Sequence, residues 1–600
     1  MCGIVGYVGQ KKALEILING LKSLEYRGYD SAGIAYINNN AIEIIKEKGK
    51  IKNLEEKINF NQNINIGIGH TRWATHGEPS VKNSHPHQVG KITLVHNGII
   101  ENYEELRTLL TNYGYSFKSE TDTEVLCALI DKLYNEKKDL KKVLNKMQNL
   151  VRGSYALGII CEDELDTLYA IRKDSPLIIG QNKDEYFIAS DVPAILKYTN
   201  KYILLDNNEI VKISDKVTIY NEKLDEIRKK INTFEGDLSS AEKNGYEHFM
   251  LKEINEENEC IQNTMFPYIE NGIDSLLEKM PDLTKYNNID IVACGSAYHT
   301  GLIGKVLIEK YADIPVNVEI ASEYRYKKHF FNKKTLVILV SQSGETADTL
   351  ASLRIAKEQG SDTLAIVNAV GSSIAREAKY ILYIKAGCEI AVATTKAYSA
   401  QISMFSLIAL NLAIRKELIE EKEISKIIKE IKKLPTTIKE LTSKSYKHIA
   451  EELYEHNDIF FLGRGIDYPI ALEGSLKLKE ISYIHSQAYA AGELKHGTIS
   501  LIKENTPVIS VVTDEYISEK TLSNIKEVKS RGAKTTLIVT EKLNKEYDCI
   551  DYKVVIPNTH ELLQTILTII PLQLISYEVA KLRDCDIDKP RNLAKSVTVE

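Results

Sequence analysis

A cysteine at position 2 follows the initiator methionine of this 600-residue chain. Removal of Met1 would leave the Cys2 thiol beside a free α-amine, whose pKa of about 7.7 to 8.0 in peptides suits it to accept a proton near neutrality. Because a thiol attacks as the thiolate, nucleophile and base would then belong to one residue. The alternative is a small apolar residue that opens a buried strand. The residues between positions 70 and 122 favour the nucleophile.

This stretch carries the residue types that an amide hydrolase acting on an amino acid needs. Attack on an amide puts negative charge on the carbonyl oxygen, and the Asn97 amide with the N–H of Gly98 offers two donors for it. The α-carboxylate and α-ammonium of glutamine would pair with Arg72 and Asp122. Taken singly, these residues have plainer explanations: a hairpin turn at Asn97 and Gly98, a surface ion pair at Arg72, a helix cap at Asp122. Together they predict glutamine hydrolysis.

A second polar group follows a predicted buried strand at residues 335–340. The run Ser341-Gln342-Ser343-Gly344-Glu345-Thr346 leads into a helix-like stretch at residues 347–357. Hydroxyls and backbone N–H groups at a helix N-terminus form an anion site without a lysine, so a phosphate would fit there. Capping of the helix by Ser or Thr explains the run about as well. A similar block further on has Thr513-Asp514-Glu515 at this point, where two acids would repel a phosphate, so we expect one such site per chain.

Three residues of the later block suit proton transfer on a sugar. Moving a carbonyl between adjacent carbons needs one group that carries a proton across, and the Glu480 carboxylate is suited to it. Lys477 lies on the same helical face and can steady an oxygen, although such a pair is more often a solvated ion pair worth roughly 0.2–0.5 kcal/mol. His496 can open a sugar ring as a general acid-base, or is an ordinary loop histidine. Residues 588–600 have no core-forming period and alone predict a frayed tail.

The elements that must position these residues form an ordered series. Residues 1–235 alternate β-rich runs with two helical segments and predict a mixed α/β domain with its chemistry on loops. Two later blocks repeat one pattern, in which a hydrophobic strand ends at Gly295 or Gly463 and a helix follows; they predict two doubly wound α/β lobes. The predicted boundaries are a first domain at 1–235, a polar linker at 236–248, lobes at 249–430 and 431–587, and a C-terminal segment at 588–600.

Composition narrows the function classes. A net charge of -6, dispersed along the chain, favours neither a nucleic-acid partner nor a charged membrane surface. Eight cysteines without a C-x-x-C pair argue against a disulfide framework or a thiolate metal site and fit a reducing cytoplasm. No leader precedes the first hydrophobic strand, and the longest apolar stretches, such as residues 562–575, contain polar interruptions. We therefore expect a soluble cytoplasmic protein without a metal or cofactor.

The strings around these residues resemble the glutamine:fructose-6-phosphate aminotransferase family, also called the glucosamine-6-phosphate synthases, over nearly the whole chain. The resemblance implies an α/β protein in which an N-terminal-nucleophile glutaminase domain, an αββα sandwich, precedes two sugar isomerase (SIS) lobes. It implies conversion of L-glutamine and D-fructose 6-phosphate to L-glutamate and D-glucosamine 6-phosphate, the first step of amino-sugar synthesis, by a homodimer. The strings are Cys2-Gly3-Ile4-Val5-Gly6, Tyr26 to Gly33, the Arg72 loop, Val95 to Asn102, Ser119 to Asp122 and the closing residues 588–600.

The resemblance also implies a role for each matched residue. Cys2 is the nucleophile, Asn97 and Gly98 form the oxyanion hole, and glutamine is bound by Arg72, Trp73, Thr75, His76 and Asp122. The family counterpart of Trp73 also gates an ammonia passage; the alternative is that Trp73 only covers the glutamine loop. The sugar phosphate is bound by Ser296, Ser341, Gln342, Ser343, Thr346 and Thr394. Isomerisation is assigned to Glu480, Lys477, His496 and Lys595, where Lys595 forms a Schiff base with the open-chain sugar and His496 crosses a dimer interface. The chain departs from the family pattern at Ala297, Thr394 and Thr498, where Ser, Ser and Pro are common.

Ammonia links the two predicted sites. In water near neutral pH it becomes ammonium, which has no lone pair, so we expect a water-excluding path between the sites and ordering of residues 72–80 and of the tail from Asp588 when sugar binds. Two other functions are considered. A glutaminase feeding a phosphoribosyl transferase would need an acidic pair before a Thr/Gly-rich pyrophosphate loop, which the sequence does not contain. In a non-catalytic sugar-phosphate sensor, Cys2, Glu480 and Lys595 would be dispensable.

Overall fold

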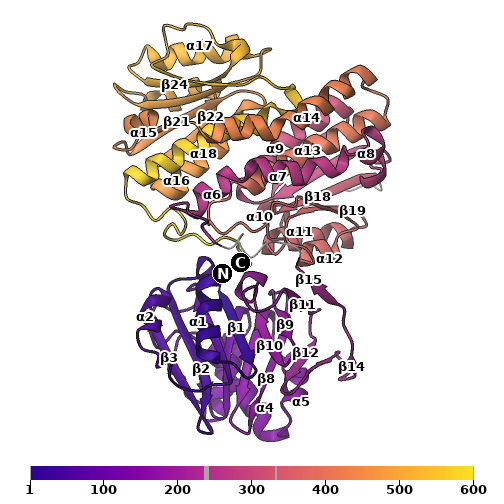
Figure 1. Ribbon diagram of the computed structural model, residues 1–600, viewed down its shortest axis with the longest axis vertical. Coiled ribbons are helices and arrows are strands. Elements are labelled where there is room, and N and C mark those ends of the chain that lie inside the picture. Colours follow the sequence, from indigo (N-terminus) through magenta and orange to yellow (C-terminus); the bar gives the residue numbers. More distant parts are fainter. Residues whose placement is uncertain (1, 235–241, 331–333, 599–600) are drawn as a thin grey trace. The chain divides into compact units, whose positions relative to one another are not determined.

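The computed structural model describes residues 2–234, 242–330 and 334–598 (Figure 1). The chain forms two compact units: an N-terminal unit of Met1–Ala241 with Ala594–Glu600, and a second unit of Glu242–Leu593. Of the predicted linker, residues 236–241 lie outside the described residues, and residues 242–248 run without helix or strand to the next helix.

The described residues of the N-terminal unit form two antiparallel sheets. The sequence of strand β1 is apolar because the strand is covered on both faces. Ile4 lies in the core between the sheets, and Val5 lies near Gly20 of helix α1. One sheet has the order β15 (Ile231–Thr233), β11 (Lys201–Leu204), β9 (Ile178–Asn182), β10 (Glu185–Ala189), β1 (Gly3–Val8), β4 (Ile66–Arg72), β2 (Ser31–Asn38), β3 (Ala41–Lys48). The other has the order β14 (Glu226–Ile227), β13 (Val217–Tyr220), β12 (Ile210–Ile213), β8 (Glu164–Lys173), β7 (Gly153–Cys161), β6 (Ile92–Ile100), β5 (His87–Val89).

Helices cover the outer faces of both sheets. Helix α1 packs on the first sheet, and α3, α4 and α5 share a buried cluster with the second, so the unit is an αββα sandwich. The prediction of two helical segments was wrong, because five α-helices lie among the described residues of this region; the shortest have too few turns for the 3.6-residue period to show. The helices are α1 (Ala13–Leu24), α2 (Ile51–Glu55), α3 (Tyr103–Asn112), α4 (Asp122–Lys137) and α5 (Leu140–Met147).

The second unit contains two parallel sheets of five described strands each, and their strand orders correspond position by position. This confirms the prediction of two doubly wound lobes. The first lobe has the order β17 (Val316–Ile320), β16 (Asn288–Ala293), β18 (Thr335–Ser341), β19 (Asp362–Val367), β20 (Tyr380–Tyr383). The second has the order β22 (His485–Ala490), β21 (Asp458–Gly463), β23 (Pro507–Val512), β24 (Lys534–Thr540), β25 (Tyr552–Ile556).

Long helices lie between these two sheets and share one core (Figure 1). Helix α13 packs on α9, and α18 packs on α16. The predicted boundary between residues 430 and 431 falls inside α14, which packs on α7 and α18. The helices are α6 (Phe249–Asn255), α7 (Glu257–Met265), α8 (Ile273–Lys279), α9 (Gly295–Ala312), α10 (Ala321–Tyr324), α11 (Ala347–Glu358), α12 (Ser373–Glu377), α13 (Lys396–Arg415), α14 (Glu421–Thr442), α15 (Lys447–Leu453), α16 (Asp467–Ser482), α17 (Ser518–Lys529) and α18 (Glu561–Leu582).

Two of these helices are unusually apolar. By length and composition α13 and α18 could each cross a bilayer, although we expected polar residues to interrupt the stretch at 562–575. In both, 94% of the apolar window is buried inside the unit. Such burial is what a core helix of a large domain requires, since a helix that is hydrophobic on all sides must be covered on all sides.

Candidate active sites

The Cys2 thiol lies at the start of β1, beside the end of β4. Pairing of these strands sets Gly3 opposite Thr71, which brings Trp73 to Cys2: the Trp73 N–H donates to Cys2 Sγ at 3.2 Å. Burial raises the pKa of the Cys2 thiol, although the hydrogen bond from Trp73 and the charge of Arg72 lower it. The thiol therefore needs a base to become a nucleophile. Met1 lies outside the described residues, so the role of the α-amine stays a prediction.

The two predicted oxyanion donors are consecutive residues of β6. Asn97 pairs with Ala156 and Gly98 with Tyr155 of β7, so the hairpin-turn alternative is wrong. The buried Asn97 amide donates to the Cys2 carbonyl at 3.0 Å. Gly98 has φ +131°, and a Cβ there would lie 2.1 Å from the Ser154 carbonyl oxygen, so only glycine fits.

Arg72 and Asp122 are both buried at this site. The Arg72 guanidinium donates to the backbone carbonyls of His76, Gly77 and Glu78, which excludes a surface ion pair. Asp122 is the first residue of α4 and accepts from the Ile100 N–H at 2.9 Å. The cap of α4 is Thr121, so the helix-cap alternative for Asp122 is wrong.

These residues converge on one pocket, with about 250 Å³ of empty space including its open mouth. The pocket brings together the predicted nucleophile, the oxyanion glycine and all five predicted glutamine-binding residues. Asn97 reaches it through its bond to Cys2. The lining residues are Cys2, Arg72, Trp73, Thr75, His76, His85, His96, Gly98, Thr121, Asp122 and Thr123.

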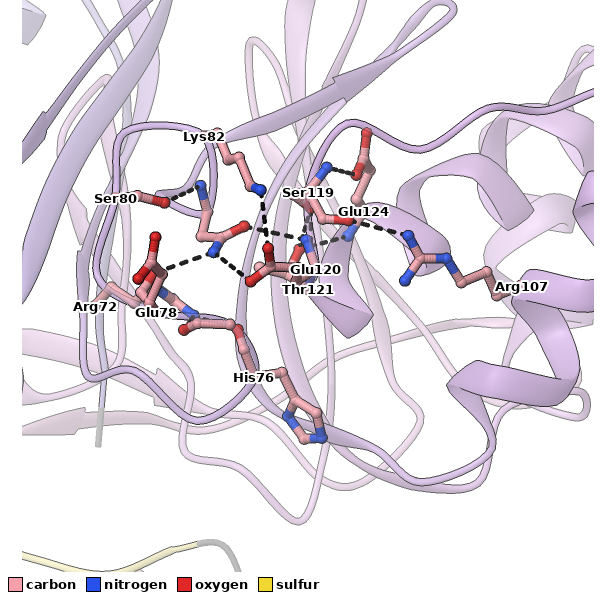
Figure 2. A network of polar contacts seen from close by, with 12 residues as sticks. Arg72, His76, Glu78, Ser80, Lys82, Arg107, Ser119, Glu120, Thr121 and Glu124 are labelled. Atoms are coloured by element: carbon pink, nitrogen blue, oxygen red, sulfur yellow. Dashed lines mark hydrogen bonds and ion pairs between the residues drawn. The ribbon is translucent and has the colours of Figure 1, made fainter.

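The loop that carries His76 is tied to the segment before α4, as Figure 2 shows. The Asn83 amide donates to the Glu78 carbonyl at 3.0 Å and to the Glu120 carboxylate at 3.2 Å, and it accepts from the Glu120 N–H at 3.1 Å. Lys82 pairs with Glu120 at 2.8 Å. The network therefore links the loop that follows Arg72 to the start of the helix that presents Asp122.

In the first lobe the predicted phosphate loop follows β18. Ser341 ends the strand, and its hydroxyl lies 2.9 Å from the Thr346 hydroxyl and accepts from the Gly344 N–H at 3.0 Å. Thr346 stands at the N-cap of α11, but within the described part of the chain its side chain makes no capping hydrogen bond. Helix capping therefore does not explain this Ser/Thr run.

The other predicted sugar-binding residues lie on neighbouring segments of the same unit. The Gln342 carbonyl accepts from the Asn368 N–H at 3.1 Å, which fixes the loop to the end of β19. The Ser343 hydroxyl accepts from the Glu345 N–H at 3.2 Å. Ser296, at the start of α9, donates to the Glu473 carboxylate at 2.8 Å.

In the second lobe, α16 presents Lys477 and Glu480 on one face. Lys477 is buried and pairs with Glu480, so the solvated-ion-pair alternative is wrong for this lysine. Burial lowers the pKa of Lys477, but the carboxylates of Glu480 and Glu473 outweigh that effect and raise it above its usual value. Glu480 is partly exposed, with 20% of its side chain accessible, and can therefore meet a substrate.

Two other predicted residues lie on other segments of the chain. His496 ends a short 3-10 helix, Glu493–His496, and is exposed. Lys595 belongs to Ala594–Glu600, which is part of the N-terminal unit. Their roles in sugar chemistry stay predictions.

Comparison with known proteins agrees with both units. A glutamine amidotransferase domain model matches residues 70–197, and a SIS domain model matches residues 282–411 and 452–583. The isomerizing glutamine–fructose-6-phosphate aminotransferase of Clostridium tetani is 52% identical, with 100% of each chain covered. The chain belongs to the glutamine–fructose-6-phosphate aminotransferase family. The predicted family and fold class are thereby confirmed.

A second full-length relative and a solved structure are also similar to the chain. The isomerizing glutamine–fructose-6-phosphate aminotransferase of Methanosarcina acetivorans is 46% identical, again with 100% of each chain covered. The C-terminal domain of glucosamine-fructose-6-phosphate aminotransferase from Francisella tularensis is 41% identical and superposes with a TM-score of 0.54. It covers 58% of this chain and 99% of its own length.

His70 is a site residue of this aminotransferase-family chain that the sequence reasoning missed. Its Nε2 lies 2.9 Å from the His96 carbonyl and 3.1 Å from Asn97 Oδ1; both are acceptors, so Nε2 carries the proton. Burial lowers the pKa of His70 to about 3, which keeps the ring neutral at neutral pH. The contact turns the Asn97 NH₂ group toward Cys2. The signal was present, because His70 precedes Arg72 by two residues on one strand and so shares its face.

The three departures from the family pattern have different surroundings. Ala297 is half-buried and packs against the core of the second unit. The Thr394 hydroxyl donates to the Glu389 carboxylate. Threonine at this position therefore keeps the hydroxyl that serine would supply and adds a methyl group. Thr498 begins the 3-10 helix Thr498–Leu501 directly after His496 and Gly497. All three lie outside the pairs that would handle protons.

Proposed function

We propose that this chain converts L-glutamine and D-fructose 6-phosphate to L-glutamate and D-glucosamine 6-phosphate. The observation that carries the proposal is the convergence of Cys2, Gly98, Arg72 and Asp122 on one pocket, with Asn97 bonded to the Cys2 carbonyl. The family relationship supports the second half of the reaction, since relatives similar along their full length bear the aminotransferase name.

In the glutamine half-reaction, the Cys2 thiolate adds to the side-chain amide carbon. The resulting oxyanion takes hydrogen bonds from the Gly98 N–H and from the second N–H of the Asn97 amide. Removal of one such donor typically lowers the rate by about 10²–10³-fold. Collapse expels ammonia and leaves a thioester, and water then releases L-glutamate and restores the thiol. His70 keeps the Asn97 amide in the orientation that this step requires.

In the sugar half-reaction, the Lys595 amine would condense with the C2 carbonyl of open-chain fructose 6-phosphate with loss of water, and ammonia would then displace that amine to leave an imine at C2. Glu480 then takes a proton from C1 and returns one to C2, which leaves an amine at C2 and an aldehyde at C1. Lys477 holds the Glu480 carboxylate from one side. Ser341 and Thr346, with the N–H groups that begin α11, would bind the phosphate. Lys595 would hold the open-chain sugar as a Schiff base before ammonia arrives.

We also propose a cytoplasmic homodimer in which His496 of the partner subunit opens the sugar ring. The exposure of this histidine on a single chain supports a role at a surface between subunits. Ordering of residues 72–80 and of the tail from Asp588 by sugar is part of the same proposal. Glutamine turnover should rise when fructose 6-phosphate is added, and equal turnover with and without the sugar would count against the ordering.

The decisive experiment incubates the purified chain with both substrates and measures glucosamine 6-phosphate. A Cys2→Ala variant is expected to lose glutamine-dependent synthesis, while solvent deuterium still exchanges into C1 of fructose 6-phosphate. Cys585→Ala, a half-buried cysteine of the second unit, serves as the control and should retain both activities. Amination by Cys2→Ala with glutamine as the only nitrogen donor would overturn the proposal, as would an active enzyme that still carries Met1.

A further inference from the structure

Glu473, a buried carboxylate on α16, was not among the predicted site residues. Its side chain is 1% exposed, and both oxygens are partnered across two helices. Ser296 donates to Oε1 at 2.8 Å, and His299 Nδ1 lies 2.8 Å from Oε2. Because a carboxylate only accepts, Nδ1 of His299 carries a proton. Glu473 therefore joins the start of α9 to the middle of α16.

The same carboxylate holds the lysine of the predicted proton-transfer pair. Lys477 Nζ lies 3.4 Å from Glu473 Oε1 and also pairs with Glu480. The three residues follow one another at four and three positions along the helix, which places them on one face. Two carboxylates thus share one buried ammonium, and the lysine can hold Glu480 in place only while Glu473 holds the lysine.

Burial distinguishes the two carboxylates. Glu480 is partly exposed and can reach a substrate carbon, whereas Glu473 is closed off from solvent by its partners. A group that is enclosed in this way cannot carry a proton between C1 and C2 of a sugar. Its negative charge and its geometry can still act on Lys477, because electrostatic interactions are strong where water is excluded.

Resting on the proposed function, we propose that Glu473 is a positioning residue of the isomerisation step. It fixes Lys477 and, through Lys477, the orientation of Glu480. It also links this pair to Ser296, which is predicted to bind the sugar phosphate. The proton-transfer helix α16 of the second lobe and the start of α9 in the first lobe are then held together by one buried carboxylate. Through this contact, residues of both lobes would contribute to one sugar site.

The test uses Glu473→Gln in the full chain and measures deuterium exchange into C1 of fructose 6-phosphate across pH. We expect kcat for exchange to fall at least tenfold while KM changes less than threefold, because the enclosed Glu473 is proposed to act on Lys477 and not on substrate binding. The acidic limb of the pH profile should move to lower pH, since removal of one negative charge leaves Lys477 to act on Glu480 alone. A loss that is merely structural would not move this limb.

Controls separate this inference from the proposed function. Glu519→Gln, at the exposed start of α17, should leave exchange and its pH profile unchanged. If the unaltered chain makes no glucosamine 6-phosphate, the proposed function fails; if it does and Glu473→Gln exchanges normally with an unmoved limb, only the role of Glu473 fails.

A second comparison applies even if Glu473→Gln alone does not fold. In a Lys477→Met background, the additional change Glu473→Gln removes a buried charge that has already lost its partner. If Glu473 acts through Lys477, the double variant and Lys477→Met alone should exchange at the same rate within about twofold. A further fivefold loss in the double variant would show that Glu473 acts by another route and would overturn the inference.

Discussion

The two lobes of the second unit differ at the point where their central strands end. In the first lobe, β18 ends in Ser341, and its hydroxyl faces that of Thr346 beside the start of α11. In the second lobe, the matching strand β23 is followed by Thr513 and Asp514, whose N–H groups both donate to the Asp467 carboxylate, at 2.8 and 3.3 Å. The Asp467 carboxylate therefore occupies the strand end that corresponds to the proposed phosphate loop of the first lobe.

This difference matches the proposed division of phosphate binding and proton transfer between the two lobes. The sequence predicted one phosphate site because Asp514 and Glu515 would repel a phosphate. The structure adds a stronger reason, since the buried Asp467 already takes the available donors. Asp467 lies in the first turn of α16, so the same contact anchors the helix that carries Lys477 and Glu480. In the second lobe Asp467 thus occupies the strand end and anchors the helix that carries the proposed proton-transfer pair.

The largest expected effect tests this division directly. Glu480→Gln should lower glucosamine 6-phosphate synthesis and C1 deuterium exchange by about 10²–10⁴-fold, because the amide cannot carry a proton between carbons. Glutamine hydrolysis, measured as glutamate release, should continue. Glu515→Gln, an exposed acid of the same lobe, is the control and should leave synthesis unchanged. Near-normal exchange in Glu480→Gln would place the proton carrier elsewhere.

A matched pair of threonine variants probes the two strand ends. Thr346→Val should raise KM for fructose 6-phosphate by about 10- to 100-fold, because a hydrogen bond to a charged group contributes roughly 1.5–3 kcal/mol. Thr513→Val should leave KM unchanged and instead lower the free energy of unfolding by about 1–3 kcal/mol, since the buried Asp467 loses a donor. Steady-state kinetics and chemical denaturation measure the two quantities. Similar KM changes in both variants would contradict the division between the lobes.

A pH series compares buried acids of the two lobes. Burial raises the pKa of Glu257, on α7, to about 8 and that of Asp467 to about 6. Since the folded state then holds a proton that the unfolded state loses, each acid makes stability fall as pH rises, by at most about 1.4 kcal/mol per pH unit. Glu257→Gln should flatten this fall between about pH 4.5 and 8, and Asp467→Asn only between about pH 3.8 and 6. Denaturation at a series of pH values measures both, and identical windows would contradict the assignment.

Much of the second unit could be predicted because its parallel strands are buried on both faces and read as continuous apolar runs. The strand predicted at residues 335–340 is β18, one residue longer than expected. Short helices such as α2 and α5 escaped prediction because they complete one or two turns.

The predicted site residues are those whose chemistry is visible in a single residue type. Glu473 was not among them, because its importance lies in contacts with Ser296 and His299, which are 177 and 174 positions away along the chain. Asp467 was missed for the same reason, since Thr513 lies 46 positions away. Spacing in sequence predicts neighbours on one helix, but it carries no information on which helix of another lobe faces them.

The apolar helix α18 has a consequence for biosynthesis. It occupies residues Glu561–Leu582 and packs against α16, α13 and α14, so the interior of the second unit has a gap until nearly all of the chain has left the ribosome. The N-terminal unit can fold largely during translation, whereas the second unit can complete its core only after α18 is released. Until then it exposes hydrophobic surface, including that of α13. Truncation before residue 561 should therefore yield insoluble material, and slow or interrupted translation should burden the chaperones of the producing cell.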